Sequence, residues 1–213
     1  MEDSLRDRAL QARAAIVAGS LRGAALATAI KAIPQLDRDA WLDEVLGIEP
    51  PPPDVDLPQG AVPYLPCGVD EILVMVRQAP VMAGDTLVDI GAGLGRAAIL
   101  AHLLSGARTL GVEIQAPLVA RARGRCAELG LAAVAFVHGD AAELALDGSI
   151  FLLYAPCNGD LLARVVRRLE EVAGRRPITV AAVGLELPEA TWLHARASSC
   201  RSLTLYDSGI RAR

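Results

Sequence analysis

The sequence predicts an α/β fold with a doubly wound, mainly parallel seven-strand sheet, helices on both faces and an N-terminal helical extension. From residue 86 onwards, apolar runs of strand length alternate with runs of helical periodicity, which favours a parallel sheet. Two short runs near the end, at residues 192–195 and 202–206, indicate closing antiparallel strands. An Ala- and Leu-rich stretch at residues 4–32 predicts the helical extension.

Each element follows from its own pattern. Acidic Asp70 and Glu71 stand where a helix is expected to begin, and negative charge is favourable in the first turn. Pro117 stands in the first turn of another expected helix, where proline is tolerated. The expected strands are residues 86–90, 107–112, 132–138, 149–154 and 177–183, and the expected helices between them are residues 69–78, 96–104, 117–129 and 160–172.

The N-terminal stretch predicts one helix or two over residues 4–32, because Gly19 and Gly23 weaken its middle. Pro34 ends this pattern. Residues 37–46 then predict a short helix with Trp41 on its apolar side.

Four consecutive prolines at residues 50–53 predict an extended, semi-rigid connector. We therefore divide the chain into a helical extension (1–48), a proline-rich connector (49–62) and a main domain (63–213). The extension is a helical cap, a substrate lid or an arm for a homodimer, and the sequence leaves these alternatives open.

A glycine loop follows the expected strand at residues 86–90, in the run Asp-Ile-Gly-Ala-Gly-Leu-Gly that begins at Asp89. A strand that turns tightly into a helix presents free backbone N–H groups, and glycine lets a ligand approach closely. The loop is not the dinucleotide fingerprint, because Arg96 stands where a glycine is required, and it lacks the Lys-Ser/Thr ending of a P-loop.

Acidic residues end three successive expected strands: Asp89, Glu113 and Asp140. The carboxyl ends of such strands line one crevice of a doubly wound sheet. Three carboxylates suit a ligand with ribose hydroxyls, an amine and a positive charge, and they suit a pyrophosphate poorly.

These stretches, residues 89–95, 111–113 and 139–141, resemble the class I S-adenosylmethionine (SAM)-dependent methyltransferases. The resemblance implies that the glycine loop passes under the methionine part of the cofactor, that Glu113 binds the ribose hydroxyls and that Asp140 lies near the adenine amine. No metal is implied. The predicted cofactor-binding residues are Tyr64, Asp89, Gly91, Ala92, Gly93, Gly95, Glu113, Ile114, Asp140, Ala141 and Tyr154.

Two Tyr-x-Pro segments, which begin at Tyr64 and Tyr154, add a narrower resemblance over roughly residues 60–184. Together with the motifs above they resemble the non-SET, seven-strand lysine methyltransferases and their bacterial relatives. Asn158 follows Pro156 at a distance of two, so this segment is not the Asn-Pro-Pro-Tyr signature of amide or adenine N-methyltransferases. That departure counts against DNA methylation.

Methyl transfer from a sulfonium is an in-line displacement in which the enzyme supplies alignment and desolvation. We predict Tyr154, Asn158 and Tyr64 as the catalytic residues. Tyr64 either closes over SAM or gates the substrate, or it is a tyrosine packed in a proline-rich turn. A base is needed only if the acceptor arrives protonated. His138, His194 and Glu186 are less favoured candidates for that base.

The remaining reactive side chains have less direct interpretations. His102 falls inside an expected helix and is interpreted as a core or surface residue. Cys67 and Cys157 stand in two loops expected to meet near the methyl group. Either one lines a substrate channel, or both are small apolar side chains in tight turns, which is the favoured interpretation.

The predicted function is SAM-dependent methyl transfer to nitrogen or oxygen of a protein side chain or small metabolite. The alternative is a non-catalytic SAM-binding regulatory or scaffolding protein. A formal charge of -4 without a basic block counts against extended nucleic-acid binding. Four widely spaced cysteines count against a structural zinc site. Without a signal peptide or membrane-length apolar run, the expected location is the cytoplasm.

Overall fold

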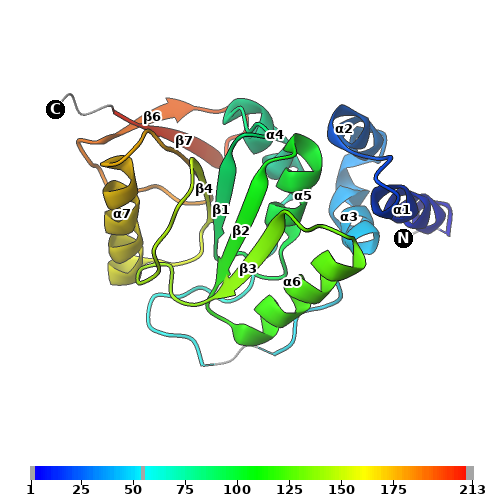
Figure 1. The fold of residues 1–213 in the computed structure, drawn as a ribbon, viewed down its shortest axis with the longest axis horizontal. Helices are drawn as coiled ribbons and strands as arrows, with labels where there is room; N and C mark the ends of the chain where they lie inside the picture. The colour runs from blue at the N-terminus through cyan, green and yellow to red at the C-terminus, as the bar shows by residue number, and fades with distance from the viewer. Residues whose placement is uncertain (1–2, 54–55, 210–213) are drawn as a thin grey trace.

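The computed structural model describes residues 3–53 and 56–209, and its centre is a seven-stranded sheet in the order β3-β2-β1-β4-β5-β7-β6 (Figure 1). The strands are β1 (Thr86–Ile90), β2 (Arg108–Glu113), β3 (Val134–His138), β4 (Ile150–Tyr154), β5 (Thr179–Val183), β6 (Leu193–Ala197) and β7 (Leu203–Ser208). The first five strands pair in parallel, and β7 pairs antiparallel with both β5 and β6. The seven-strand prediction is confirmed, with a mixed sheet.

Helices cover both faces of the sheet (Figure 1). One face packs against α4 (Val69–Gln78), α5 (Arg96–Ser105) and α6 (Ala116–Glu128), whose buried side chains share one hydrophobic cluster. The other face packs against α7 (Gly159–Ala173), whose apolar stripe joins a second cluster with β4 and β5. Turns connect β3 to β4.

The strand order reverses at β1, which lies between β2 and β4. The chain runs outward from β1 to β3 and then returns to β4 on the other side. In an open α/β sheet, ligands bind at such a switch point, beyond the carboxyl ends of the strands. The topology therefore places the glycine loop after β1 opposite the loop after β4.

The N-terminal stretch forms two helices, α1 (Asp3–Val17) and α2 (Gly23–Lys31), with Gly19 at φ +75° between them. A 3₁₀ turn (Gln35–Asp37) leads into α3 (Arg38–Leu46), whose Trp41 is buried. These helices belong to the same hydrophobic cluster as α4 and α5. Their side chains extend that layer outward from the sheet. The predicted domain boundaries, and a role as lid or dimer arm, stay predictions.

Across residues 3–53 and 56–209, no helix combines the length and the apolar character needed to cross a membrane. Within the same ranges, no three or more His, Cys, Asp or Glu side chains are grouped so that they could hold a metal ion.

Candidate active site

A cleft opens at the switch point, with about 660 Å³ of empty space including its open mouth. A smaller cavity of about 270 Å³ adjoins it and shares Tyr64, Gly91 and Tyr154 with it. Among the predicted cofactor residues, the cleft is lined by Tyr64, Gly91, Glu113, Ile114, Asp140, Ala141 and Tyr154, and the smaller cavity by Asp89 and Ala92 as well. The structure therefore brings most of the predicted cofactor residues together.

All three glycines of the loop have positive φ values: +78° at Gly91, +54° at Gly93 and +86° at Gly95. A Cβ atom at Gly93 would lie 2.3 Å from Cε2 of Tyr64, so the tyrosine ring rests on this glycine. A Cβ atom at Gly95 would lie 2.6 Å from Cζ of Phe136. Gly93 therefore lies under Tyr64, and Gly95 is required for packing against β3; neither lines the cleft.

Glu113 is buried at the end of β2 and is held by two backbone groups. Its Oε2 accepts a hydrogen bond from the Gly93 N–H at 2.8 Å, and its Oε1 accepts one from the Gln115 N–H at 2.8 Å. A carboxylate has about four lone-pair positions, so both oxygens keep the capacity to accept from a ligand. Glu113 is thus a preoriented acceptor in the wall of the cleft.

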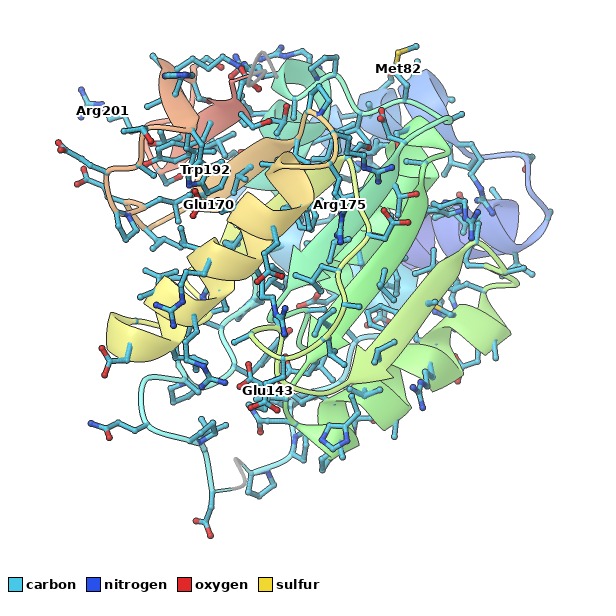
Figure 2. The ribbon with its side chains drawn as sticks, turned by 60° about the vertical axis from the view of Figure 1, so that its left-hand side comes forward. Met82, Glu143, Glu170, Arg175, Trp192 and Arg201 are labelled. Atoms are coloured by element: carbon cyan, nitrogen blue, oxygen red, sulfur yellow. The ribbon has the colours of Figure 1, made fainter. Side chains whose placement is uncertain are left out.

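Asp140 follows β3, and its Oδ1 accepts a hydrogen bond from the Ala142 N–H at 2.8 Å. Its Oδ2 forms an ion pair with Nη2 of Arg164 on α7 at 3.2 Å. The same Nη2 lies 3.0 Å from Glu143, which Figure 2 shows on the segment between β3 and β4. Arg164 therefore anchors this acidic wall, a role that the sequence pattern did not reveal.

Asp89 is the most deeply buried acid of the site, with 3% of its surface exposed. Within the described residues its Oδ2 has no hydrogen-bond partner. Burial raises the pKa of Asp89 to about 7, the Ala98 backbone hydrogen bond opposes that rise, and the Glu113 charge adds to it. Because nearly all buried polar atoms have partners, this oxygen beside a cavity indicates a missing donor.

The segment of residues 60–67, here called the covering segment, crosses the cleft beside the loop after β4. The Val62 N–H donates to the Pro156 carbonyl at 3.1 Å, and the Asn158 N–H donates to the Gly60 carbonyl at 2.8 Å. These bonds hold the start of the segment and leave Tyr64 over the glycine loop. Burial raises the pKa of Tyr64 to about 12, so its hydroxyl stays protonated at neutral pH.

Tyr154 ends β4 and lines both cavities. Burial raises its pKa as well, so it is also a neutral hydroxyl. Ala155 has φ +38°, and among the described residues it is the one non-glycine residue with a positive φ. Such a backbone costs on the order of 1–3 kcal/mol and is typical of functional loops.

Several predicted side chains lie outside the cleft. Asn158 is exposed at the N-cap of α7, so its catalytic role stays a prediction without support from its position. None of the three histidines lines the cleft: His102 is on α5, His138 ends β3 and His194 is on β6. Glu186 lines a separate groove beside β6 and β7.

Cys157 lines the cleft and Cys67 lines the smaller cavity, and both are buried. Burial raises the pKa of Cys157 to about 11 and raises the pKa of Cys67 further. Both thiols therefore stay protonated at neutral pH, which fits their interpretation as small apolar side chains.

Comparison with known proteins shows which proteins this chain is similar to. Residues 87–173 match a family model described as a methyltransferase domain. The chain is 33% identical over 138 residues to a protein-L-isoaspartate O-methyltransferase of Methylorubrum populi, a match that covers 62% of this chain and 58% of that protein. The chain thus spans little more than half the length of this curated relative.

Solved structures that resemble this chain also include methyltransferases. An RNA methyltransferase from Salinibacter ruber in complex with S-adenosyl-L-homocysteine (SAH) is 26% identical, with a TM-score of 0.55 over 70% of this chain and 95% of that chain. TrmN from Thermus thermophilus, at 17% identity, shares the fold with a TM-score of 0.52 over 65% of this chain and 48% of that chain. The chain therefore carries a methyltransferase domain of the class I, SAM-dependent type.

Proposed function

We propose that this chain binds SAM in the cleft and transfers its methyl group to nitrogen or oxygen of a protein side chain or small metabolite. The observation that carries the proposal is the unpartnered Oδ2 of buried Asp89, which lies beside a cavity and close to the preoriented Glu113. A ligand with a cationic amine and vicinal hydroxyls satisfies both groups.

The lining of the cleft fits each part of that cofactor. Asp89 would accept from the α-ammonium group, and Glu113 would accept from the ribose hydroxyls. Ile114 and Leu161 offer apolar surface for an adenine ring, near Asp140 for its amine. The acids contribute negative charge, which favours a sulfonium cation over an anionic nucleotide.

SAM supplies an electrophilic methyl group, so the chain must mainly align the acceptor and exclude water. Tyr64 covers Gly93, which is buried, and Pro156 packs against Gly91, which stays exposed. Tyr154 presents a neutral hydroxyl where the two cavities meet. Because no histidine lines either cavity within the described residues, we propose an acceptor that arrives deprotonated and needs no strong base.

A carboxylate is such an acceptor, because it is ionised at neutral pH. The isoaspartate O-methyltransferase among the relatives favours a protein acceptor of this kind. A neutral amine is equally compatible with the cleft, and the narrower resemblance to lysine methyltransferases stays a sequence-based prediction.

A second candidate is methylation of RNA. The 26% identical structure from Salinibacter ruber favours it, since that protein is described as an RNA methyltransferase. The formal charge of -4 counts against it, because RNA binding depends on neutralising phosphate charge.

The test is transfer of a labelled methyl group from SAM to three separate fractions of a cell extract: proteins, RNA and small molecules. We expect label in the protein or small-molecule fraction. Label in RNA alone would establish the second candidate instead. Cofactor binding without label in any fraction would favour a non-catalytic SAM-binding protein.

Replacing Tyr154 with phenylalanine is expected to lower turnover about tenfold, because it removes a hydroxyl worth roughly one hydrogen bond to the acceptor. The SAH dissociation constant should change less than twofold. The measurement pairs steady-state kinetics with calorimetric titration. Tyr206→Phe is the matched control, because that hydroxyl accepts from the Leu187 N–H away from the cleft. Unchanged turnover in Tyr154→Phe would make Tyr154 a packing residue.

A further inference from the structure

We infer that two buried arginines, Arg96 and Arg125, make the N-terminal helices part of the cofactor site by holding the glycine loop and the covering segment in place. We call this pair the arginine brace. Both are positioning residues that act through the backbone of the loops. The inference about cofactor affinity rests on the proposed function, whereas the inference about loop order stands on the contacts alone.

Arg96 is the first residue of α5 and is only 5% exposed. Its Nε donates to Oδ1 of Asp43 on α3 at 2.9 Å, and its Nη2 forms an ion pair with Oδ2 of the same carboxylate. Its Nη1 donates to the Cys67 carbonyl at 3.1 Å. One guanidinium therefore joins the extension, the end of the covering segment and the start of the helix that follows the glycine loop.

Arg125 makes a parallel connection from α6. Its Nη1 donates to the Leu94 carbonyl, inside the glycine loop, at 2.7 Å. Its Nε and Nη2 donate to the Gly47 carbonyl at 3.3 and 3.2 Å. Gly47 caps the C-terminal end of α3, where a cation is favourable. Arg125 thus joins the far end of α3 to the loop beneath Tyr64.

The places where these arginines bond indicate that they position the glycine loop and the covering segment, and do more than attach the N-terminal helices to the main domain. The extension already buries Ile16, Leu26 and Ile30 in the shared hydrophobic cluster, so apolar packing is enough to attach it. Burying charges adds little net stability compared with apolar side chains of similar size. The brace instead bonds to the backbone of the two segments that meet where Tyr64 rests on Gly93, at Leu94 just after Gly93 and at Cys67 three residues after Tyr64.

A second acid of α3, Asp39, also pairs with the brace, because its Oδ1 lies 3.5 Å from Nη1 of Arg96. Another ion pair of the extension lies away from the brace. Glu44, the neighbour of Asp43 on α3, pairs with Arg6 at the surface, and the Arg6 side chain is 66% exposed. Asp43 and Glu44 therefore offer a matched pair of acids on one helix. One touches the brace, and the other does not.

The experiment compares Asp43→Asn with Glu44→Gln and with Ile30→Val, a core variant that loosens the extension without touching the brace. Two quantities are measured well below the melting temperature. The first is amide hydrogen exchange of residues 63–68 and 91–96 in the ligand-free protein. The second is the dissociation constant for SAH by calorimetric titration.

Asp43→Asn is expected to speed exchange in both segments and to raise the SAH dissociation constant about tenfold, which corresponds to about 1.4 kcal/mol. Glu44→Gln and Ile30→Val should leave both quantities within twofold of wild type. Asp43→Glu, which keeps the charge, should restore most of the affinity. The double variant Asp43→Asn/Arg96→Gln should lose no more affinity than Arg96→Gln alone, because both substitutions break one interaction.

Unchanged exchange and affinity in Asp43→Asn would overturn the inference, as would an equal loss in Ile30→Val. If the wild-type protein fails to bind SAH, the proposed function fails. The exchange rates of the ligand-free variants then decide the inference by themselves.

Discussion

Replacing Asp89 with asparagine is expected to weaken SAH binding by roughly tenfold to a hundredfold and to stabilise the ligand-free protein at pH 8. The affinity falls because a charge-assisted hydrogen bond, worth roughly 1.5–3 kcal/mol, is lost. The stability rises because an ionised carboxylate at 3% exposure has an oxygen without a partner. Asp89→Asn thus has opposite expected effects: it weakens ligand binding, which uses the charged carboxylate, and it stabilises the ligand-free protein, in which that charge lacks a partner.

The pH dependence has a definite sign. The pKa of Asp89 is raised to about 7 in the folded protein, from an ordinary value of 3.8. The folded state therefore holds a proton that the unfolded state has released, and stability is lost as the pH rises from about 4 to about 7. Each unit of difference corresponds to about 1.4 kcal/mol. The free energy of unfolding of the wild-type protein, minus that of Asp89→Asn, should therefore fall across this window. Above the window this difference should be constant.

Cofactor affinity should follow the opposite course, because the ligand's ammonium group favours the ionised carboxylate. Wild-type affinity for SAH should rise with pH up to about 7, whereas the affinity of Asp89→Asn should not. The other ionisable groups around Asp89 remain in both proteins, so the difference isolates Asp89. They are Glu113, Tyr64, Cys67, Arg96 and Tyr154.

The measurements are urea unfolding and calorimetric titration between pH 5.5 and 8, with Asp7→Asn on the exposed surface of α1 as the control. A variant that binds SAH as tightly as wild type, with the same pH profile, would show that Asp89 does not hold the cofactor.

Replacing Gly93 with valine is expected to lower SAH affinity more than a hundredfold. The backbone at Gly93 has φ +54°, a conformation that is a genuine outlier for a β-branched residue. Its Cβ would lie 2.3 Å from the Tyr64 ring, and the added methyl groups would occupy the space above the loop. Both the loop and the covering segment must then shift.

Calorimetric titration with SAH tests this expectation, and circular dichroism shows whether the variant is folded. Gly124→Ala is the matched control, because a Cβ at Gly124 on α6 meets nothing within 4 Å. Normal binding by folded Gly93→Val would remove the glycine loop from the cofactor site.

Sequence reasoning located the elements around the switch point well, because their signals are local. Strand β1 has the boundaries that the apolar run of residues 86–90 predicts. Helix α5 begins at Arg96, directly after the third glycine, as expected. The three acids at the ends of β1, β2 and β3 meet at one edge because parallel strands share that edge.

Contacts between distant segments escaped the sequence. Arg96 stands out only as the residue that breaks the dinucleotide fingerprint, and its partner Asp43 lies 53 residues earlier in a region with separate helical periodicity. Nothing local links Arg164 to Asp140, and nothing local places Tyr64 on Gly93. Asn158 shows a different limit: its motif position suggested the cleft, whereas the structure places it at the exposed N-cap of α7, and its catalytic role stays a prediction.

The most direct test of the cofactor assignment is a calorimetric titration of the purified chain with SAH at pH 7.5. We expect one binding site per chain with a dissociation constant on the order of micromolar, or about -8 kcal/mol. The Asp89→Asn variant should lose most of that affinity while remaining folded. If a wild-type protein that is shown to be folded does not bind SAH, the cleft is not a SAM site.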